Sequence, residues 1–429
     1  MAAARAASWI APASDHKVAR SLRARRGLLT RWERDAARVR TTHAPLVWFH
    51  APSVGEGLQA RPVAQALRAA HPTVQQAYSF FSPSAESFAR SIAADVSGYL
   101  PFDTEDAADR LLDALRPAAL VFVKLDVWPV LVHRAKVRRI PVALLSATLS
   151  AASGRRGAMS RWLLHDAYRA LDAVGAIDPD HAARLVDLGV RPEVIEVMGD
   201  TRFDQVHERA ARADRTRAPL SLLTSVRPTL VAGSTWPADE AVLLPAWRAL
   251  RARLPDARLI IAPHEPTAAH CAPIESWAAA EGLTLSRLTA IEQRGAIDTA
   301  DVVLVDRVGV LGDLYAMANA AFVGGGFHAA GLHSVIEPAA FGVPVLFGPG
   351  HQMSREAGLL LAAGAARSRP DAATLADDLY AWLSDGGAWR RAGRLGRDLV
   401  EAERGATARA LTIVERLAGL SIASPKRLG

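Results

Sequence analysis

The chain has 429 residues, of which 50% are hydrophobic and 22% are charged. This composition excludes a disordered protein and provides enough apolar surface for two or three domains with filled cores. The single cysteine, Cys271, excludes an internal disulfide. No stretch reaches the roughly 18 uninterrupted apolar residues of a membrane-spanning helix, and the first residues lack the apolar run of a signal peptide, so we expect the chain to stay in the cytoplasm.

The formal charge of +7 is concentrated in residues 1–45, which hold ten basic and three acidic residues. Apolar side chains stand between these basic residues, namely Trp9, Ile10, Leu22, Leu28, Leu29 and Trp32. Such a segment can lie on an anionic membrane surface; a solvated basic helix without a lipid partner is the alternative. No recognition motif accompanies the charge, so nucleic acid is not expected as a partner. The sequence therefore predicts residues 1–45 as a membrane-associating arm.

Short apolar runs alternate with longer amphipathic stretches, which is typical of buried parallel strands joined by helices. In the first half, this pattern predicts strands at Leu46–His50, Val74–Phe80, Ala119–Lys124, Val142–Ser146, Ala173–Ile177 and Val194–Met198. In the second half, it predicts strands at Thr229–Ala232, Leu259–Ala262, Val302–Val305, Ala320–Val323 and Pro344–Phe347.

A charged segment from Val206 to Arg217, followed by Pro219, separates the two series of strands. We therefore expect an α/β fold of two doubly wound, Rossmann-like domains that face each other across a cleft. The first domain is predicted at 46–210 and the second, with the terminal helices, at 211–429.

The first segment with chemical potential runs from Leu46 to Gly57. It reads as a strand, a glycine-containing turn and a helix that opens near Gly57 or Leu58. Such a turn places the Glu56 carboxylate at the end of a strand and close to a helix N-terminus. From these residues alone, Glu56 is as well explained by a role in starting the helix as by a role in catalysis.

A second segment begins with Gly324-Gly325-Gly326 after a predicted strand and continues to Ser334 and Glu337. Glycines allow the backbone to approach a ligand closely, so a phosphate site is reasonable here, with a plain glycine turn as the alternative. Glu337 begins an E-P-x-x-x-G-x-P arrangement that is typical of nucleotide-sugar glycosyltransferases with two domains. A carboxylate in this position can accept hydrogen bonds from both hydroxyls of a ribose.

Two further polar groups follow predicted strands. His264 comes after Leu259–Ala262 and suits a phosphate or a base edge, although a lone histidine is more often a surface or capping group. Asp178 and Asp180 superficially resemble a metal-binding D-x-D pair, but Asp180 is expected to cap the following helix. No zinc spacing or P-loop is present, so no metal or cofactor is expected.

With these motifs in place, residues 20 to 400 resemble the 3-deoxy-D-manno-octulosonic acid (Kdo) transferases. Ser53-Val54-Gly55-Glu56 is similar to the family's S-V-G-E, and Asp126-Val127-Trp128-Pro129 to its D-x-W-P. Gly199–Asp204 and Gly233–Trp236 match two further family motifs, and 320–349 matches the family's strand, glycine turn, ribose glutamate and G-P closure. Pro263-His264-Glu265-Pro266 and Val308-Gly309-Val310 depart from the common P-R-H-P and M-G-E.

The resemblance implies an inverting glycosyltransferase of the GT-B type that moves Kdo from CMP-Kdo to a lipid A precursor in lipopolysaccharide biosynthesis. It implies that Glu56 is the general base. It places CMP contacts on Pro263, His264, Val308, Gly309, Val310, Ser334, Val335, Ile336 and Glu337. It also implies a peripheral location at the cytoplasmic face of the inner membrane.

Other residues at strand ends are expected to contact acceptor or donor: Ser53, Gly55, Lys124, Asp126, Arg155, Arg156, Gly325 and Gly326. For Lys124 and Asp126 a structural ion pair is an equal alternative, and for Arg155 and Arg156 a solvated charge pair is. Two rival functions stay open. One is a nucleotide-sugar epimerase of the same fold, and the other is a membrane-associated module that binds CMP without turnover.

Overall fold

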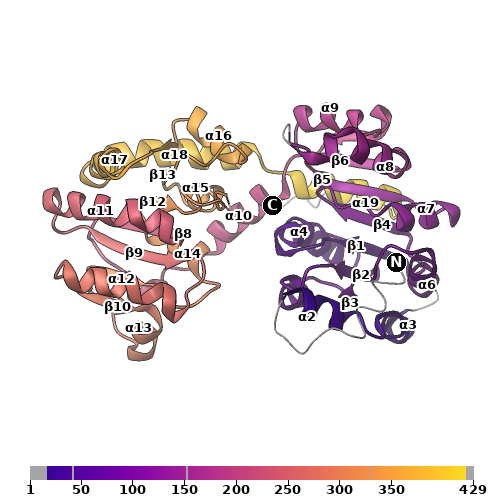
Figure 1. Ribbon diagram of the computed structural model, residues 1–429, viewed down its shortest axis with the longest axis horizontal. Coiled ribbons are helices and arrows are strands. Elements are labelled where there is room, and N and C mark those ends of the chain that lie inside the picture. Colours follow the sequence, from indigo (N-terminus) through magenta and orange to yellow (C-terminus); the bar gives the residue numbers. More distant parts are fainter. Residues whose placement is uncertain (1–16, 41–42, 151–152, 330, 422–429) are drawn as a thin grey trace. The chain divides into compact units, whose positions relative to one another are not determined.

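The computed structural model describes residues 17–40, 43–150, 153–329 and 331–421, which form two compact units. The first unit comprises Met1–Asp204 together with Arg404–Gly429, and the second comprises Gln205–Glu403. Each unit is an α/β domain built around a parallel sheet of seven strands (Figure 1). The prediction of two doubly wound α/β domains is therefore confirmed.

The sheet of the first unit has the strand order β3-β2-β1-β4-β5-β6-β7. Its strands are β1 (Leu46–His50), β2 (Gln75–Phe80), β3 (Val96–Tyr99), β4 (Ala119–Val123), β5 (Val142–Ala147), β6 (Ala173–Ala176) and β7 (Ile195–Val197). The helices around it are α2 (Lys17–Ala24), α3 (Leu28–Val39), α4 (Val54–Ala70), α5 (Ala85–Phe88), α6 (Glu105–Leu115), α7 (Pro129–Val137), α8 (Ala158–Arg169), α9 (Pro179–Asp187) and α19 (Ala406–Leu417). Helix α10 (Thr201–Arg212) spans the division between the units.

The sheet of the second unit has the strand order β10-β11-β9-β8-β12-β13-β14. Its strands are β8 (Thr229–Thr235), β9 (Arg258–Pro263), β10 (Leu285–Arg287), β11 (Val302–Leu304), β12 (Ala320–Val323), β13 (Val345–Phe347) and β14 (Ala366–Ser368). Its helices are α11 (Pro237–Arg253), α12 (Ala268–Ala280), α13 (Leu288–Arg294), α14 (Leu311–Leu314), α15 (Ile336–Ala340), α16 (Arg355–Ala362), α17 (Ala372–Ser384) and α18 (Gly386–Ala402).

The interior strands of the second unit are buried on both faces. Successive residues of a strand point to opposite faces, and the structure shows a separate core on each: Leu230 and Leu259 pack in one cluster, Val231 and Ile260 in the other. Helices α11 and α17 supply the first cluster, whereas α13 and α14 supply the second. This burial explains why these strands appear in the sequence as continuous apolar runs.

In each sheet, the order in which successive strands are added reverses beside the first strand of that unit. In the first unit β1 lies between β2 and β4, and in the second β8 lies between β9 and β12. Open parallel sheets bind ligands at the carboxyl ends of the strands at such a reversal. The segments that follow β1 and β4, and those that follow β8 and β12, are therefore the places to look for function.

The last helix belongs to the first unit, although the terminal helices are predicted with the second domain. Buried Ala406, Ala410, Ile413 and Val414 of α19 pack in the core of the first unit. The backbone N–H groups of Gly405 and Thr407 also donate to the Asp204 carboxylate, at 2.7 and 2.6 Å. The prediction for this helix was wrong because a position late in the sequence does not specify which core an apolar face completes.

The predicted membrane arm is in part a structural element. Trp9 and Ile10 lie outside the described residues, but Leu28 and Trp32 of α3 are buried in the core of the first unit. The Trp32 indole N–H donates to the Tyr99 carbonyl at 2.8 Å. The interpretation of Leu28 and Trp32 as membrane-facing groups was therefore wrong, because their apolar faces cover the sheet near β3.

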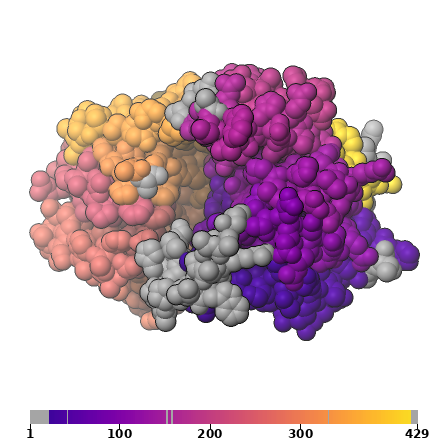
Figure 2. All heavy atoms as spheres, turned by 45° about the vertical axis from the view of Figure 1, so that its right-hand side comes forward, coloured from indigo at the N-terminus to yellow at the C-terminus, as the bar shows by residue number. Residues whose placement is uncertain are grey.

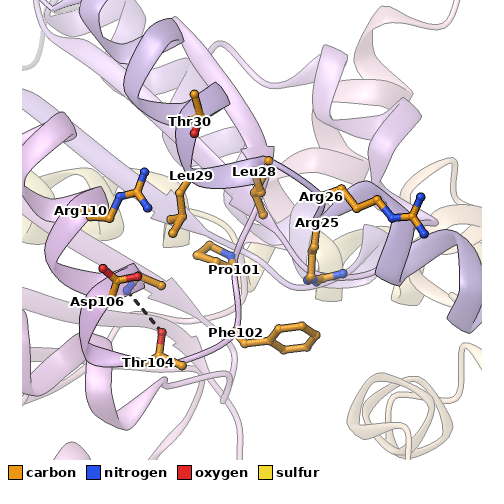
Figure 3. Close-up of a pocket in the computed structure, with 12 residues that line it drawn as sticks. Arg25, Arg26, Leu28, Leu29, Thr30, Pro101, Phe102, Thr104, Asp106 and Arg110 are labelled. Carbon is orange, nitrogen blue, oxygen red and sulfur yellow. Dashed lines mark hydrogen bonds between the residues drawn. The ribbon is translucent and has the colours of Figure 1, made fainter. Parts of the chain in front are cut away.

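Arg25, between α2 and α3, is also buried. Its guanidinium lies 3.9 Å from the centre of the Phe81 ring and donates to the Phe81 carbonyl at 3.0 Å. Burial lowers the pKa of Arg25 to about 10. A hollow of about 290 Å³ opens beside it, lined by Leu29, Phe102 and Arg110 among others (Figure 3). None of the candidate functional residues whose side chains the structure describes lines this hollow.

Among the described residues, no helix has the length and apolar character required to cross a membrane.

Candidate functional site

The first candidate site follows β1 and β4, the two strands beside the reversal in the first sheet. Helix α4 begins at Val54, with Ser53 as its N-cap, so the helix starts earlier than the predicted Gly57 or Leu58. Glu56 consequently lies in the first helical turn rather than in the loop before it. Carboxylates are favoured in this position because the N-terminus of a helix carries partial positive charge.

Two neighbours hold the Glu56 carboxylate. The Ser53 hydroxyl donates to Oε2, and the Lys124 ammonium lies 3.2 Å from Oε1. Burial raises the pKa of Glu56, but the Ser53 hydrogen bond and the positive charge of Lys124 outweigh it and bring the pKa below its ordinary value. Glu56 is therefore ionised at neutral pH and able to accept a proton.

Lys124 reaches Glu56 from a strained backbone. It directly follows β4 and has a φ of 69°, in the left-handed region that residues with a Cβ rarely adopt. This conformation costs on the order of 1–2 kcal/mol for a non-glycine residue. Such strain persists where the surrounding structure enforces it and is frequent at functional sites.

Asp126 belongs to a neighbouring polar network rather than to an ion pair with Lys124. Its Oδ2 accepts from the Trp128 indole at 2.9 Å and lies 3.2 Å from Nε2 of the fully buried His50. Burial raises the pKa of Asp126, but the hydrogen bonds from His50 and Trp128 outweigh it and lower the pKa. On the other side of the imidazole, His50 Nδ1 lies 2.9 Å from the Ser79 hydroxyl.

Arg155 is engaged within the first unit. Its guanidinium donates to the Leu125 carbonyl and to the Tyr168 hydroxyl, and Nη2 lies 3.6 Å from Asp126 Oδ1. The alternative of a solvated charge pair is therefore wrong for Arg155, because this guanidinium fastens the loop after β4. The side chain of Arg156 lies outside the described part of the structure. Gly55 is exposed, and among the described residues a Cβ here would have only Ser53 Oγ within 4 Å, at 3.9 Å.

The second candidate site follows β8 and β12. The Trp236 indole stacks on the His264 ring, with centroids 4.6 Å apart, and on the His328 ring, at 4.3 Å. His333 stacks on His264 at 4.5 Å, and its Nε2 accepts from the Trp236 indole N–H at 3.1 Å. We call Trp236, His264, His328 and His333 the aromatic stack. Of these four rings, the sequence predicts only His264 as a ligand contact; the other rings share the signal of following a strand at the carboxyl edge.

The surroundings of His333 in the aromatic stack favour its neutral imidazole. Burial, with a further contribution from the His264 ring, lowers the pKa of His333 to about 4. Since Nε2 accepts the Trp236 proton, His333 is neutral in this arrangement. The exposed His264 is the ring of the stack that is most accessible to a ligand.

The glycine turn after β12 is held by Asp239. This fully buried carboxylate accepts from the backbone N–H groups of Gly325, at 2.8 Å, and Phe327, at 3.1 Å. The expectation that backbone amides of this turn are open to a phosphate is therefore wrong for these two. A Cβ on Gly325 would lie 2.1 Å from the Gly331 carbonyl oxygen, and one on Gly326 would lie 2.5 Å from the Gly348 nitrogen. These glycines are explained by close backbone packing.

Glu337 lies in the first turn of α15, near an ion pair. Burial raises the pKa of Glu337 above its ordinary value, and the Arg209 guanidinium offsets part of that rise. Arg209 Nε donates to Asp313 at 2.7 Å. A Cβ on Gly312 would lie 2.3 Å from the Arg209 guanidinium carbon, so Gly312 makes room for this arginine.

The remaining predicted donor contacts differ in accessibility. Val308, Gly309 and Ser334 are exposed, whereas Pro263, Val310, Val335 and Ile336 are buried. His264 is tied to the end of β8, because its backbone N–H donates to the Thr235 carbonyl at 2.9 Å.

Two expectations concerned metals and caps. Among the described residues, no group of three or more His, Cys, Asp or Glu side chains is placed to hold a metal ion. The cap of α9 is Asp178, whose carboxylate accepts from the His181 N–H at 2.8 Å, and not the predicted Asp180. The chain enters the helix earlier than predicted, because Pro179 occupies its first position.

Comparison with known proteins finds a family to which the chain is similar. A family model described as 3-deoxy-D-manno-octulosonic-acid transferase matches residues 20–205. The 3-deoxy-D-manno-octulosonic acid transferase of Bordetella pertussis is 31% identical over 395 residues, covering 90% of each chain. The enzyme of the same name from Haemophilus influenzae is 27% identical over 306 residues and covers 70% of each chain.

Solved structures show the same fold at low sequence identity. The UDP-GlcNAc 2-epimerase of Neisseria meningitidis, bound to UDP-GlcNAc, superposes with a TM-score of 0.61 at 13% identity and covers 87% of this chain and 99% of its own. A glycosyltransferase from Rickettsia africae superposes with a TM-score of 0.57 at 10% identity and covers 88% of this chain and 100% of its own. One architecture thus serves isomerases and transferases, and the fold by itself does not decide between them.

Proposed function

The chain belongs to the 3-deoxy-D-manno-octulosonic acid transferase family of glycosyltransferases, and from that premise we propose that it transfers Kdo from CMP-Kdo to a lipid A precursor. The observation that carries this proposal is the Glu56 carboxylate, held by Ser53 and Lys124 at the carboxyl edge of the first sheet. This group is ionised, partly exposed and in the position of the family's S-V-G-E glutamate.

In the proposed reaction, Glu56 removes the proton from a hydroxyl of the acceptor. The hydroxyl oxygen attacks the anomeric carbon of the donor sugar, the bond from that carbon to the phosphate oxygen of CMP breaks, and the configuration inverts. The proton ends on Glu56 and CMP leaves with the bonding electrons. No covalent intermediate on the protein is needed.

Lys124 has two roles in this proposal. Its ammonium lowers the pKa of Glu56 and so keeps the carboxylate ionised, and it fixes the carboxylate in one orientation. A base with a low pKa is a weaker proton acceptor. Glu56 would therefore be a stronger base if the approaching acceptor hydroxyl displaced Ser53 or Lys124 from its carboxylate.

The donor nucleotide is proposed to bind the second unit beside the aromatic stack. His264 and Ser334 are exposed polar groups that suit the phosphate, and the Glu337 carboxylate suits the ribose hydroxyls. The exposed backbone near Val308 and Gly309 is proposed to complete the nucleotide site. Because two amides of the glycine turn are bound to Asp239, side chains are expected to supply most of the phosphate contacts.

The test is an incubation of the full chain with enzymatically generated CMP-Kdo and a tetra-acylated lipid A precursor, followed by mass spectrometry of the lipid. We expect a mass gain of one or more Kdo units, which is retained in EDTA. The Glu56→Gln variant should lose it, whereas the control Glu193→Gln, at an exposed carboxylate of the first unit, should keep it.

Two outcomes would contradict the proposal. A soluble sugar product formed without acceptor would favour the epimerase. Binding of CMP with no product of either kind would favour a module without turnover.

A further inference from the structure

His50 is a buried imidazole to which the proposed reaction gives no role. It ends β1 and is completely buried. Its direct neighbour in β2 is Ser79, whose hydroxyl lies 2.9 Å from His50 Nδ1. Its Nε2 lies 3.2 Å from Oδ2 of Asp126, in the segment after β4 on the other side of β1. Both nitrogens of this imidazole thus contact polar groups from the segments that flank β1.

The direction of these hydrogen bonds follows from the Trp48 indole. Its N–H donates to Ser79 Oγ at 2.9 Å, so the Ser79 hydroxyl is left to donate its own proton, and His50 Nδ1 accepts it. The ionised Asp126 carboxylate can only accept, so His50 Nε2 carries the imidazole proton and donates it. Donation therefore runs in one direction, from Trp48 through Ser79 and His50 to Asp126.

Ser79, His50 and Asp126 are the residue types of a hydrolase triad, but they are connected in the opposite way. In such a triad the serine contacts Nε2 of the histidine and the aspartate contacts Nδ1. Here the serine contacts Nδ1 and the aspartate contacts Nε2. Ser79 is also completely buried, so it is not placed to attack a substrate. The imidazole therefore acts on the carboxylate and not on the serine.

Asp126 connects this buried chain to the surface. Its Oδ2 accepts from His50 and from the Trp128 indole, at 3.2 and 2.9 Å. Its Oδ1 lies 3.6 Å from Arg155 Nη2, and 27% of the side chain is exposed. The purple part of the chain, which includes the segment after β4, forms part of the surface of the first unit (Figure 2). One carboxylate oxygen is thus held from the interior, and the other is accessible to a ligand.

The imidazole is itself held in one orientation. The Phe122 ring stands at 79° to it, with centroids 5.9 Å apart, and the Trp128 ring stands at 84°, at 5.8 Å. The backbone of His50 is paired with β2 on one side and β4 on the other. The donor that faces Asp126 is therefore in place before a ligand arrives, which is the condition for a preorganised site.

We propose that His50 is a positioning residue, which fixes the Asp126 carboxylate through Nε2 so that Oδ1 accepts a hydrogen bond from a hydroxyl of the acceptor. This hydroxyl is a different one from that which Glu56 deprotonates. The contact with the acceptor rests on the proposed function, whereas the orientation of Asp126 rests on the hydrogen bonds of the first unit alone.

Two substitutions separate the two hydrogen bonds of His50. The glutamine amide nitrogen can replace Nε2, so His50→Gln can still donate to Asp126. The shorter asparagine reaches only as far as Nδ1, so His50→Asn keeps a partner for Ser79 and removes the donor to Asp126. His71→Asn is the matched control, because His71 Nε2 also contacts a carboxylate of the first unit, that of Glu415, at 2.7 Å. Thermal unfolding measures the loss of stability in each variant.

The first readout is Kdo transfer by the full chain. We expect His50→Asn to lower kcat by about tenfold to a hundredfold, with a smaller change in KM for the acceptor, because the carboxylate loses its fixed orientation. His50→Gln should stay within about threefold of wild type, and His71→Asn should lose stability without losing kcat. Equal losses of kcat in His50→Asn and His50→Gln, or an unchanged kcat in both, would overturn the proposal.

The second readout needs no turnover. Burial raises the pKa of Asp126, and the His50 hydrogen bond is the strongest influence that lowers it. A carbon-13 NMR titration of the Asp126 carboxyl, identified with Asp126→Asn, should therefore give a higher pKa in His50→Asn than in wild type or His50→Gln. Arg155 and Tyr168 also face this carboxylate and are the same in all variants. An equal pKa in all three proteins would overturn the proposal.

Wild type alone provides a third readout, which does not depend on how the variants fold. Nitrogen-15 NMR should show a proton on His50 Nε2 and none on Nδ1, and a proton on Nδ1 would overturn the proposal. Failure of the proposed function is recognised separately: wild type would transfer no Kdo, while the carboxyl titration and the His50 signals would still be as expected. That result would remove the acceptor contact and leave the positioning of Asp126 intact.

Discussion

The two units have similar backbones and different chemistry. Both contain a parallel sheet of seven strands in which the order of strand addition reverses beside the first strand of the unit, and polar groups gather at the carboxyl ends of the strands there. In the first unit these groups are charged, with Glu56 and Lys124 in contact. In the second they are aromatic rings and a glycine turn held by Asp239. The topology thus specifies where a site lies, and the residues after each strand specify what it does.

The largest expected effect concerns Glu56. If it is the base, Glu56→Gln should lower kcat by about 10²- to 10⁴-fold. Affinity for CMP should not change, because the nucleotide is assigned to the other unit. Steady-state kinetics and calorimetric CMP binding measure the two effects, with Glu193→Gln as control. A variant that keeps more than about a tenth of the wild-type rate would remove Glu56 from this role.

The next effect concerns the glycine turn of the second unit. Gly325→Ala forces a φ of 93° on alanine and places a Cβ 2.1 Å from the Gly331 carbonyl oxygen. Strain and overlap together should cost about 2–5 kcal/mol and weaken CMP binding. Gly282→Ala is the matched control, since its φ is 68° but no atom in the described part of the chain lies within 4 Å of the added Cβ. The control should lose stability only through strain and bind CMP normally, and equal loss of CMP affinity in both variants would contradict the packing argument.

A smaller effect should follow from Lys124→Met. The positive charge of Lys124 lowers the pKa of Glu56, so its removal should raise that pKa. The acid limb of the pH–rate profile should therefore move to higher pH, with less than about a tenfold change in rate at neutral pH. Lys136→Met, which removes an ion pair with Asp172 elsewhere in the first unit, is the control. An unchanged acid limb would show that Lys124 does not tune the base.

The smallest effect concerns His333. Its pKa of about 4 lies below the ordinary value of about 6.5, so the unfolded chain binds a proton first as the pH falls. The contribution of His333 to stability is complete above about pH 6.5 and is lost as the pH falls toward 4. His333→Gln should reduce the difference between unfolding temperatures at pH 7 and pH 4.5. A variant with the same pH dependence as wild type would contradict this assignment.

The sequence predicts the interior strands well because their two buried faces produce continuous apolar runs. It does not predict β3, β10 and β14, whose sequences are Val-Ser-Gly-Tyr, Leu-Ser-Arg and Ala-Arg-Ser. All three lie at sheet edges, where one side has no neighbouring strand and a polar residue is tolerated. None of these three sequences contains a run of adjacent apolar residues, so the pattern of apolar residues carries no signal for them.

For the candidate site, too, the sequence predicts some features and not others. Ser53, Glu56 and Lys124 are each identifiable from motifs and strand ends, and the structure brings them together. The sequence does not reveal which of the polar side chains contact one another. Lys124 contacts Glu56 and not Asp126, because its backbone turns into the left-handed region after β4. The aromatic stack depends in the same way on rings that lie up to 97 residues apart.

The return of α19 to the first unit has a consequence for synthesis. Residues Ala406, Ala410, Ile413 and Val414 complete the core of that unit, but the ribosome makes them only after the whole of the second unit. Domains generally fold as units during translation, with the N-terminal one first. Here the second unit has its entire sequence available first, and the earlier-made unit must keep an apolar surface open until α19 emerges. The order of folding is thereby uncoupled from the order of synthesis, and the unfinished first unit is the stage at which a chaperone would be most needed.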